Sequence, residues 1–346
     1  MGIFPRLPGM AKDGIIRRGA ALSTDSRTGV CWCDTMTERQ KALIAAAACV
    51  LFWGLSFVSS KIAVAVFPPM TLGALRFGLA VVFLIFIKGR CAPKEKLALR
   101  DLPCLFGAGL IGVTLYFFCE NNGVSLVTAS EASIIIAAIP VLTMAAERLV
   151  QSRAKGNSPT VRIGSRHWLG AAVSMIGVAL VAGASVSGTP ASPSGSLPGY
   201  LFMGGAAASW VIYCFLTRPL FARRSRIYIV FWQTVFGFLG FLPFAAAEYP
   251  RWGRPDLPVL LHLGFLGICC SALGYWIYAR SLAVLGVAVS SLFINFIPVV
   301  TVIAGFFILG DRLSPLQWAG AALVLSGVYL AMWERPGNRP GPRRRK

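Results

Sequence analysis

Ten runs of about 20 mostly apolar residues constrain the fold of this chain more than any other feature. The apolar core of a bilayer is about 30 Å thick, so a helix needs about 20 apolar residues to cross it. The runs predict helices, because barrel strands would alternate apolar and polar residues over about 10 positions. The predicted transmembrane helices are 42–60, 70–87, 102–119, 124–146, 168–186, 199–217, 227–247, 257–279, 284–309 and 316–333.

The composition supports a lipid environment. Only 13% of the residues are charged and the mean hydropathy is +0.69, whereas about 25% of a soluble domain is charged. The net charge of +20 could indicate nucleic-acid binding, but the basic residues avoid the apolar runs and collect in alternate loops. The sequence therefore predicts the lipid bilayer as a partner and no nucleic acid.

The basic residues also predict the orientation in the membrane. Of the 33 Lys and Arg residues, 28 lie in the two tails and in the loops after the second, fourth, sixth and eighth runs. Lys and Arg concentrate in cytoplasmic loops. Both termini are therefore predicted to be cytoplasmic, in a multi-pass protein of the bacterial cell (inner) membrane.

The second half of the chain resembles the first. A shift of 157 positions places Trp53 on Trp210, Lys61 on Arg218 and Arg76 on Gln233. A shift of 158 places Gly109 on Gly267 and residues 139–141 on 297–299, and a shift of 150 aligns 167–172 with 317–322. Because each unit has five helices, its copy enters the membrane from the opposite face.

The predicted fold is thus an all-α integral membrane protein, with ten transmembrane helices as two inverted five-helix repeats. Inverted repeats are common in transporters, where substrate binds near the membrane midplane between the halves. Duplication retained only for packing is the alternative interpretation.

Several motifs resemble the EamA-type transporters of the drug/metabolite transporter superfamily, over residues 40–334. The resemblance rests on the order, spacing and duplication of these motifs more than on any single one. They are Phe52-Trp53-Gly54-Leu55-Ser56-Phe57 with Lys61, Pro69 with Leu75-Arg76-Phe77, and Ile297-Pro298-Val299 through Leu309-Gly310-Asp311-Arg312-Leu313 to Gln317-Trp318-Ala319-Gly320 and Gly327-Val328.

The resemblance implies a ten-helix fold, with two EamA-like domains in tandem, that exports small metabolites or drugs without an ATPase. One departure concerns Asp311, since the family usually has Leu-Gly-Glu where this chain has Leu-Gly-Asp. Glu147 follows Pro140 by seven residues, whereas Asp311 follows Pro298 by thirteen. The two acids therefore need not have equivalent roles.

Glu131 is the first candidate for function, because it is expected about seven residues, or about 10 Å, into the helix 124–146. A charge at the centre of a membrane helix costs about 2.5–3.5 kcal/mol on insertion scales. Desolvation disfavours an ionised carboxyl, so Glu131 could exchange a proton or bind a substrate amine. The alternatives are that it reaches the interface or pairs with Arg76.

Three further polar residues accompany it. Arg76 lies about a third of the way into helix 70–87 and requires a carboxylate partner, Glu131 or Glu120 being nearest in membrane depth. Its role could be structural, or it could bind an anionic substrate. Glu120 and Asn121 are expected to end the helix 102–119 near the outer face. There they could be interfacial polarity or contact substrate at the rim.

Two prolines and three side chains complete the candidate site. Pro140 and Pro298 are repeat-equivalent, and proline removes a backbone donor, so both predict kinks that line or gate a cavity, with a kink that serves only packing as the alternative. Asn295 offers a donor and an acceptor as a substrate contact. Trp53 and Trp210 could wall the cavity or simply pack.

Motifs for other chemistry are missing from the sequence. It contains no G-x-x-x-x-G-K-[ST] and no H-E-x-x-H, and C-x-C at Cys31 and Cys33 is a weak metal signal. We predict no enzyme activity and no cofactor. The predicted partner is a small solute, amino-acid-like or drug-like, with transport coupled to a proton gradient or to the solute gradient itself. The predicted state is a monomer or a homodimer. The alternative is a membrane-embedded enzyme or receptor without transport.

The predicted organisation follows from these segments. A disordered cytoplasmic tail occupies 1–40, with Met36 as an expected alternative start. The first repeat is 41–186, a Gly/Ser/Pro-rich linker is 187–199, the second repeat is 200–334, and a basic cytoplasmic tail is 335–346.

Overall fold

The computed structural model describes residues 37–92, 95–143, 146, 165–186, 196–221, 223–278, 281, 284 and 295–332. The predicted tail before Met36, most of the linker and the basic C-terminal tail lie outside this part of the chain. The described residues from Glu38 onward belong to a single compact unit.

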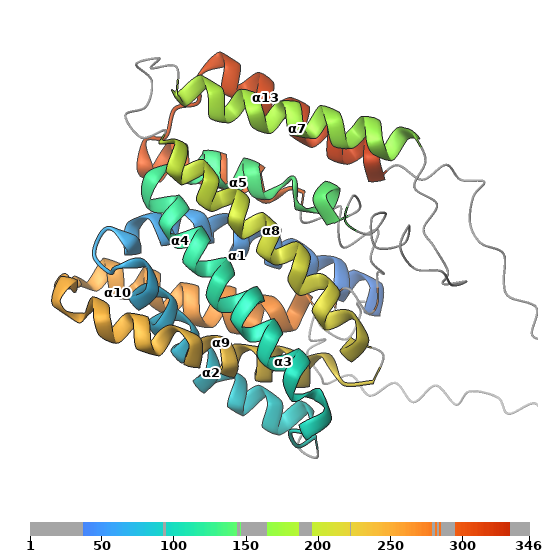
Figure 1. Cartoon of the computed structure of the whole chain (residues 1–346), viewed down its shortest axis with the longest axis vertical. Helices are drawn as coiled ribbons and strands as arrows, with labels where there is room; N and C mark the ends of the chain where they lie inside the picture. The colour runs from blue at the N-terminus through green and yellow to red at the C-terminus, as the bar shows by residue number, and fades with distance from the viewer. Residues whose placement is uncertain are drawn as a thin grey trace, which may run out of the picture. The chain divides into compact units, whose positions relative to one another are not determined.

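All regular structure among the described residues is helical (Figure 1). The first repeat comprises α1 (Glu38–Val64), α2 (Pro69–Cys91), η1 (Leu99–Asp101), α3 (Leu102–Gly109), the π-helical η2 (Leu110–Leu115), α4 (Tyr116–Leu126), α5 (Ala129–Ile136) and α7 (Ser165–Val186). The second comprises α8 (Leu197–Phe221), α9 (Arg226–Glu248), η3 (Tyr249–Arg251), α10 (Leu257–Gly264), the π-helical η4 (Phe265–Leu273), α12 (Ile297–Ala304), the π-helical η5 (Gly305–Leu309) and α13 (Pro315–Met332).

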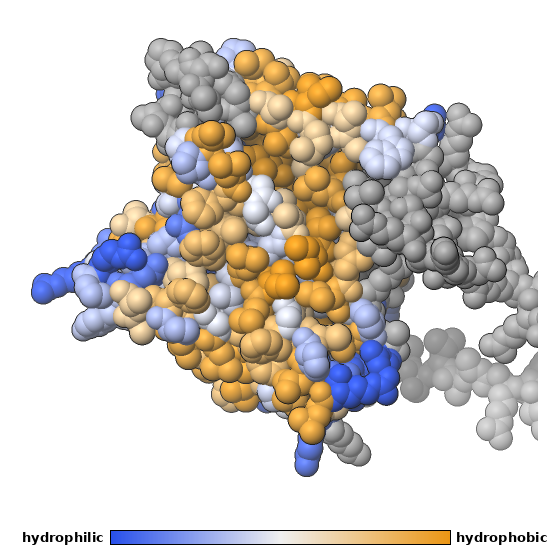
Figure 2. Space-filling view, viewed as in Figure 1, coloured by the Kyte–Doolittle hydropathy of each residue, from blue (hydrophilic) through white to orange (hydrophobic). Residues whose placement is uncertain are grey.

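The described part of the chain contains ten apolar helices, which confirms the predicted fold class. Six are long and apolar enough to cross a membrane: Glu38–Val64, Pro69–Cys91, Leu99–Leu126, Leu197–Phe221, Arg226–Arg251 and Leu257–Tyr278. Four shorter apolar helices are Ala129–Thr143, Trp168–Val181, Ile297–Leu309 and Pro315–Leu330. Apolar side chains such as Phe307 (80% exposed) face outward, and the face seen in Figure 2 is largely apolar, with hydrophilic residues gathered toward its edges.

The predicted boundary between the third and fourth helices is wrong. The third helix continues past 119 to Leu126, and α5 begins only at Ala129. The helix tolerates Asn121 and Asn122 because their amides donate to the carbonyl oxygens of Pro69 and Phe118, both at 2.8 Å. It ends where Thr128 caps α5.

A short turn lies just before each of the two predicted proline kinks. A turn at 137–138 precedes Pro140, and a turn at 295–296 precedes Pro298, which lies in the first turn of α12. Proline is favoured there because the N–H it lacks would have no intrahelical acceptor. The two turns are 158 positions apart, the repeat shift, so a turn precedes the equivalent proline in each repeat.

Two glycine contacts show the internal repeat in three dimensions. A Cβ on Gly109 would lie 2.8 Å from the carbonyl oxygen of Gln233, and a Cβ on Gly267 would lie 2.9 Å from that of Arg76. Both pairs are related by the repeat shifts of 158 and 157. Each glycine therefore lets the third helix of one repeat approach the second helix of the other.

The last helices of the repeats, α7 and α13, lie side by side (Figure 1). A Cβ on Gly177 would lie 2.6 Å from the oxygen of Gly320, and one on Gly327 would lie 2.5 Å from that of Gly170. These pairs exchange under the shift of 150, so the α7–α13 contact is also symmetric.

Candidate functional site

Arg76 lies between the repeats and contacts residues of both. It is 2% exposed, and its Nε donates to the Ser271 hydroxyl at 2.7 Å. Its guanidinium lies 4.4 Å from the ring centroid of Phe117, and its Nη1 is 3.9 Å from Oε1 of Glu120. Among the described residues, this Nη1 makes no hydrogen bond. The predicted carboxylate partner of Arg76 is thus Glu120, and the expected alternative pairing with Glu131 is wrong.

Glu120 and Asn121 lie deeper than predicted. Glu120 is 4% exposed and Asn121 is 0% exposed, and their helix continues to Leu126. The prediction that they end a helix at the outer face is therefore wrong. Asn121 joins α4 to Pro69 at the start of α2.

An aromatic row connects the two repeats beside Arg76. The ring centroids of Trp53 and Tyr275 are 5.5 Å apart, those of Tyr275 and Trp210 6.4 Å, and those of Trp210 and Tyr116 5.4 Å. The indole of Trp53 donates to the carbonyl of Cys270 at 3.1 Å, next to the Ser271 that holds Arg76. The wide turns of a π-helix leave such carbonyls available, and π-turns are frequent at functional sites.

Glu131 lies at a helix start, so its predicted mid-helix depth is wrong. It is the third residue of α5 and forms a capping box with Thr128, whose backbone N–H and hydroxyl both donate to its Oε2. The hydroxyl of Tyr200 and the amide of Gln317 donate to its Oε1 at 2.8 and 2.6 Å. We call Thr128, Glu131, Tyr200 and Gln317 the Glu131 cluster. It joins both repeats at the end of the bundle where Val64 lies.

Two contacts that sequence reasoning missed lie at the same end of the bundle. Asp311 Oδ2 accepts from the backbone N–H and hydroxyl of Ser130 at 3.2 and 2.9 Å. The Lys61 ammonium donates to the carbonyls of Val124 and Val127 at 2.8 and 2.7 Å, where α4 ends and a cation is favoured by the helix dipole. For these contacts the sequence contained no signal. For the position of Glu131 it contained one, Thr128-x-x-Glu131, the capping-box pattern that marks a helix start.

Asn295 lies in the turn before α12, with its neighbour Phe296 59% exposed. The cluster of Glu131 and the centre at Arg76 are built from other residues. Asn295 remains a predicted substrate contact. Pro140 and Pro298 remain predicted gating positions.

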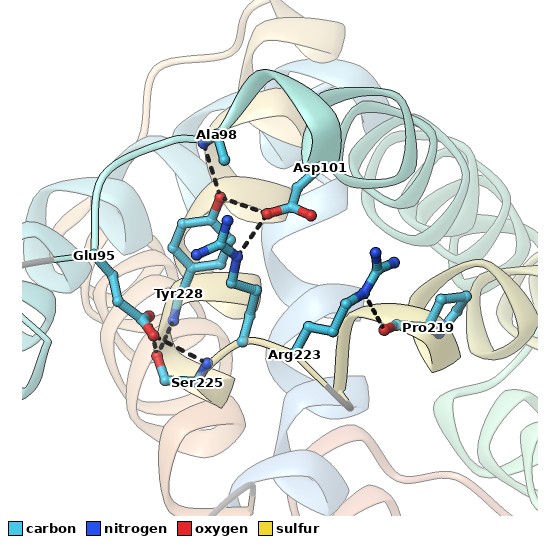
Figure 3. A network of polar contacts seen from close by, with 8 residues as sticks. Glu95, Ala98, Asp101, Pro219, Arg223, Ser225 and Tyr228 are labelled. Atoms are coloured by element: carbon cyan, nitrogen blue, oxygen red, sulfur yellow. Dashed lines mark hydrogen bonds and ion pairs between the residues drawn. The ribbon is translucent and has the colours of Figure 1, made fainter.

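Carboxylates bind the starts of α2 and α9 from the opposite repeat. At the Val64 end, Glu248 accepts from the N–H and hydroxyl of Thr71 at 2.7 and 2.9 Å. At the other end (Figure 3), Glu95 accepts from the N–H and hydroxyl of Ser225. Anions are stabilised at helix N-termini, so these two contacts, called the α2–α9 clamps, hold α2 and the loop that follows it against α9.

An ion pair reinforces the clamp shown in Figure 3. Arg224 donates from Nε to Asp101 at 2.6 Å, and Tyr228 donates to the same carboxylate at 3.3 Å. The hydrogen bond to Asp101 raises the pKa of Arg224, which stays charged in any case.

Comparisons with known proteins agree with this architecture. The chain is 29% identical to a "Probable amino-acid metabolite efflux pump" of Salmonella typhimurium, over 81% of this chain and 91% of that protein. It is 27% identical to a "Probable terminal-alkyne amino-acid exporter" of Streptantibioticus cattleyicolor, over 86% and 96%. It is 26% identical to an "Uncharacterized transporter" of Archaeoglobus fulgidus, over 85% and 100%.

A solved crystal structure shares the fold, with a TM-score of 0.57 at 21% identity, over 84% of this chain and 96% of that chain. The sequence profile described as the EamA-like transporter family matches residues 40–183 and 197–333. These two stretches correspond to the two structural repeats and cover most of the chain. This multi-pass integral membrane protein therefore belongs to the EamA-like transporter family.

Proposed function

We propose that the protein exports a small amino-acid-like solute by alternating access, as a secondary transporter of the bacterial cytoplasmic membrane. The observation that supports this proposal is the symmetric pair of glycine contacts at Gly109 and Gly267. Because the two halves make equivalent contacts, each can adopt the conformation of the other, as alternating access requires. Export and the solute class are inferred from the names of the relatives. A non-transporting receptor or enzyme is the disfavoured alternative.

In the proposed orientation, both termini are cytoplasmic and the Val64 end faces outward. The Glu131 cluster, the contact between Ser130 and Asp311, and Lys61 all join helices at that end. This set of contacts supports a state closed to the outside. Solute release then requires these contacts to break while the α2–α9 clamps persist.

The solute site is proposed at Arg76, Glu120 and the aromatic row, with Asn121 fixing the start of α2. Buried ionisable residues at membrane depth mark sites of transport, and the aromatic rings offer apolar surface for the body of the solute. The energy source is proposed to be the solute gradient or protons, with a monomer or homodimer as the functional unit.

The proposal is tested with purified protein in liposomes. Liposomes preloaded with one unlabelled amino acid should accumulate the same labelled amino acid by exchange, for at least one of the twenty proteinogenic amino acids. Empty liposomes and liposomes with heat-unfolded protein are the controls. Exchange no faster than in the controls for all twenty would contradict the proposed solute class.

A further inference from the structure

The charge at Arg76 is not needed for the packing of its helix. Its repeat equivalent is Gln233, and the backbone of each residue makes the same close contact with a glycine of the other repeat. Gln233 is neutral, and its side-chain oxygen accepts from the Tyr213 hydroxyl at 3.0 Å. An uncharged side chain therefore supports this helix contact, and the guanidinium requires another explanation.

The guanidinium of Arg76 is fixed in position, but not all of its N–H donors make hydrogen bonds to the described residues. Ser271 of the second repeat fixes its Nε, and the ring of Phe117 covers it at 4.4 Å. Its Nη1 is buried and makes no hydrogen bond within the described part of the chain. A buried donor of a charged group costs more to leave unpaired than a neutral one, so an acceptor at this nitrogen would be strongly favoured.

Among the described residues, the carboxylate paired with Arg76 is too far away to supply that bond. Glu120 Oε1 lies 3.9 Å from Nη1, beyond the 2.7–2.9 Å of a charge-assisted hydrogen bond. Glu120 can balance the charge of Arg76 at that distance without occupying its hydrogen-bonding fork. Arginine binds carboxylates through two parallel N–H groups, a geometry that a second carboxylate could adopt here.

We propose that Arg76 binds the carboxylate of the transported solute, while Glu120 pairs with the ammonium group of the same solute. The site then selects zwitterions of the α-amino acid type, because only they satisfy both buried charges. The inference rests on the proposed function and deepens it. The aromatic row (Trp53, Tyr116, Trp210 and Tyr275) contacts the apolar body of the solute.

The two repeats differ at the position of Arg76, so the proposed site binds the solute carboxylate on the side of the first repeat. Arg76 has a neutral equivalent in Gln233, so the carboxylate-binding group proposed at Arg76 is not duplicated at the equivalent position. One solute is therefore bound for each transport cycle.

The test compares analogues of whichever of the twenty amino acids is exchanged fastest in liposomes. Its carboxamide lacks the carboxylate, and its N-acetyl derivative lacks the ammonium. Both should compete with labelled amino acid at least 10-fold more weakly than the amino acid itself. R76Q should weaken competition by the amino acid about 10- to 100-fold and should abolish its preference over the carboxamide. E120Q should abolish the preference over the N-acetyl derivative.

Two measurements separate a binding role from a structural one. R76Q should retain the thermal unfolding temperature of the wild type within a few degrees, since glutamine is the residue at the equivalent position 233. R251Q, in which the replaced arginine side chain is 71% exposed, is the matched control and should keep both preferences.

Two results would overturn the inference and leave the proposed function intact. In the first, an amino acid is exchanged but its carboxamide competes equally well. In the second, R76Q still prefers the amino acid over the carboxamide. Loss of exchange in R76Q together with loss of folding would be resolved by R76K, which keeps the charge without the fork. Full carboxylate preference in R76K would also contradict recognition by the guanidinium fork. Failure of all twenty amino acids would instead overturn the proposed function.

Discussion

The carboxylate of Asp311 accepts hydrogen bonds from both the backbone N–H and the hydroxyl of Ser130, at 3.2 and 2.9 Å. The two residues are 181 positions apart and belong to different repeats. The contact binds the start of α5 to the loop before α13, so any motion that separates these helices must break it.

Removing this contact should open the Val64 end more often. Hydrogen bonds to charged groups contribute about 1.5–3 kcal/mol, so D311N should raise the open population about 10-fold or more. A cysteine at the buried Ser133, in a background without other cysteines, should then react faster with a membrane-impermeant maleimide. D256N is the matched control, because Asp256 only caps its own helix α10. Equal labelling in D311N and D256N would refute the closing role.

Glu131 should act mainly as a structural acceptor. Four donors from Thr128, Tyr200 and Gln317 converge on its two oxygens, and a glutamine would place an N–H₂ against some of them. E131Q should therefore lose about 1–3 kcal/mol of stability, measured by thermal unfolding in detergent. E38Q, at an exposed residue, should change little.

The same E131Q variant tests the proton-coupling prediction from the sequence. We expect transport by E131Q to keep the pH dependence of the wild type, because the hydrogen bonds at Glu131 indicate a structural acceptor and not a proton carrier. A flat pH profile with unchanged stability would support coupling through Glu131 and contradict the structural role.

The symmetric glycines should not tolerate even a methyl group. G109A and G267A would each place a Cβ less than 3.0 Å from backbone atoms of the other repeat, and overpacking typically costs about 1–3 kcal/mol. Both variants should show a lower unfolding temperature. G264A, one turn before Gly267 and with nothing within 4 Å of its Cβ, should match the wild type. Similar losses for G264A and G267A would argue against the close helix contact.

The α2–α9 clamp at the Val64 end should depend on Glu248. This carboxylate accepts two hydrogen bonds from Thr71 and is 7% exposed, so E248Q should destabilise the protein by about 1–3 kcal/mol. R251Q removes only the exposed partner of the same carboxylate, at 3.7 Å, and exposed ion pairs contribute about 0–1 kcal/mol. Equal unfolding temperatures for the two variants would contradict the clamp.

The inverted topology has a direct test. Epitope tags inserted after residues 190 and 340 should be accessible from opposite sides of the membrane, because five helices separate them. Intact and permeabilised cells would be compared, with an N-terminal tag expected on the same side as the tag after 340. Accessibility of the two inserted tags from one side would overturn the arrangement of the repeats.

The ten-helix fold and the internal repeat followed from the sequence because both can be read from the order of residues along the chain. Apolar runs of sufficient length must be helices in lipid, and equivalences such as Gly109 with Gly267 are visible by shifting the chain against itself. The helix end at Leu126 was missed because the amides of Asn121 and Asn122 suggested a boundary. Inside the bundle these amides find backbone acceptors, one of them on another helix.

The sequence by itself determined which residues are ionisable and apolar, how many helices form and how the two repeats correspond. Only the tertiary structure decided that Arg76 faces Glu120 and Ser271, and that Glu131 accepts from Tyr200 and Gln317. The reason is physical: a helix sequence fixes the spacing of side chains along its own axis. The partner of a buried charge is chosen by the rotation and depth of neighbouring helices, which packing across the whole bundle sets.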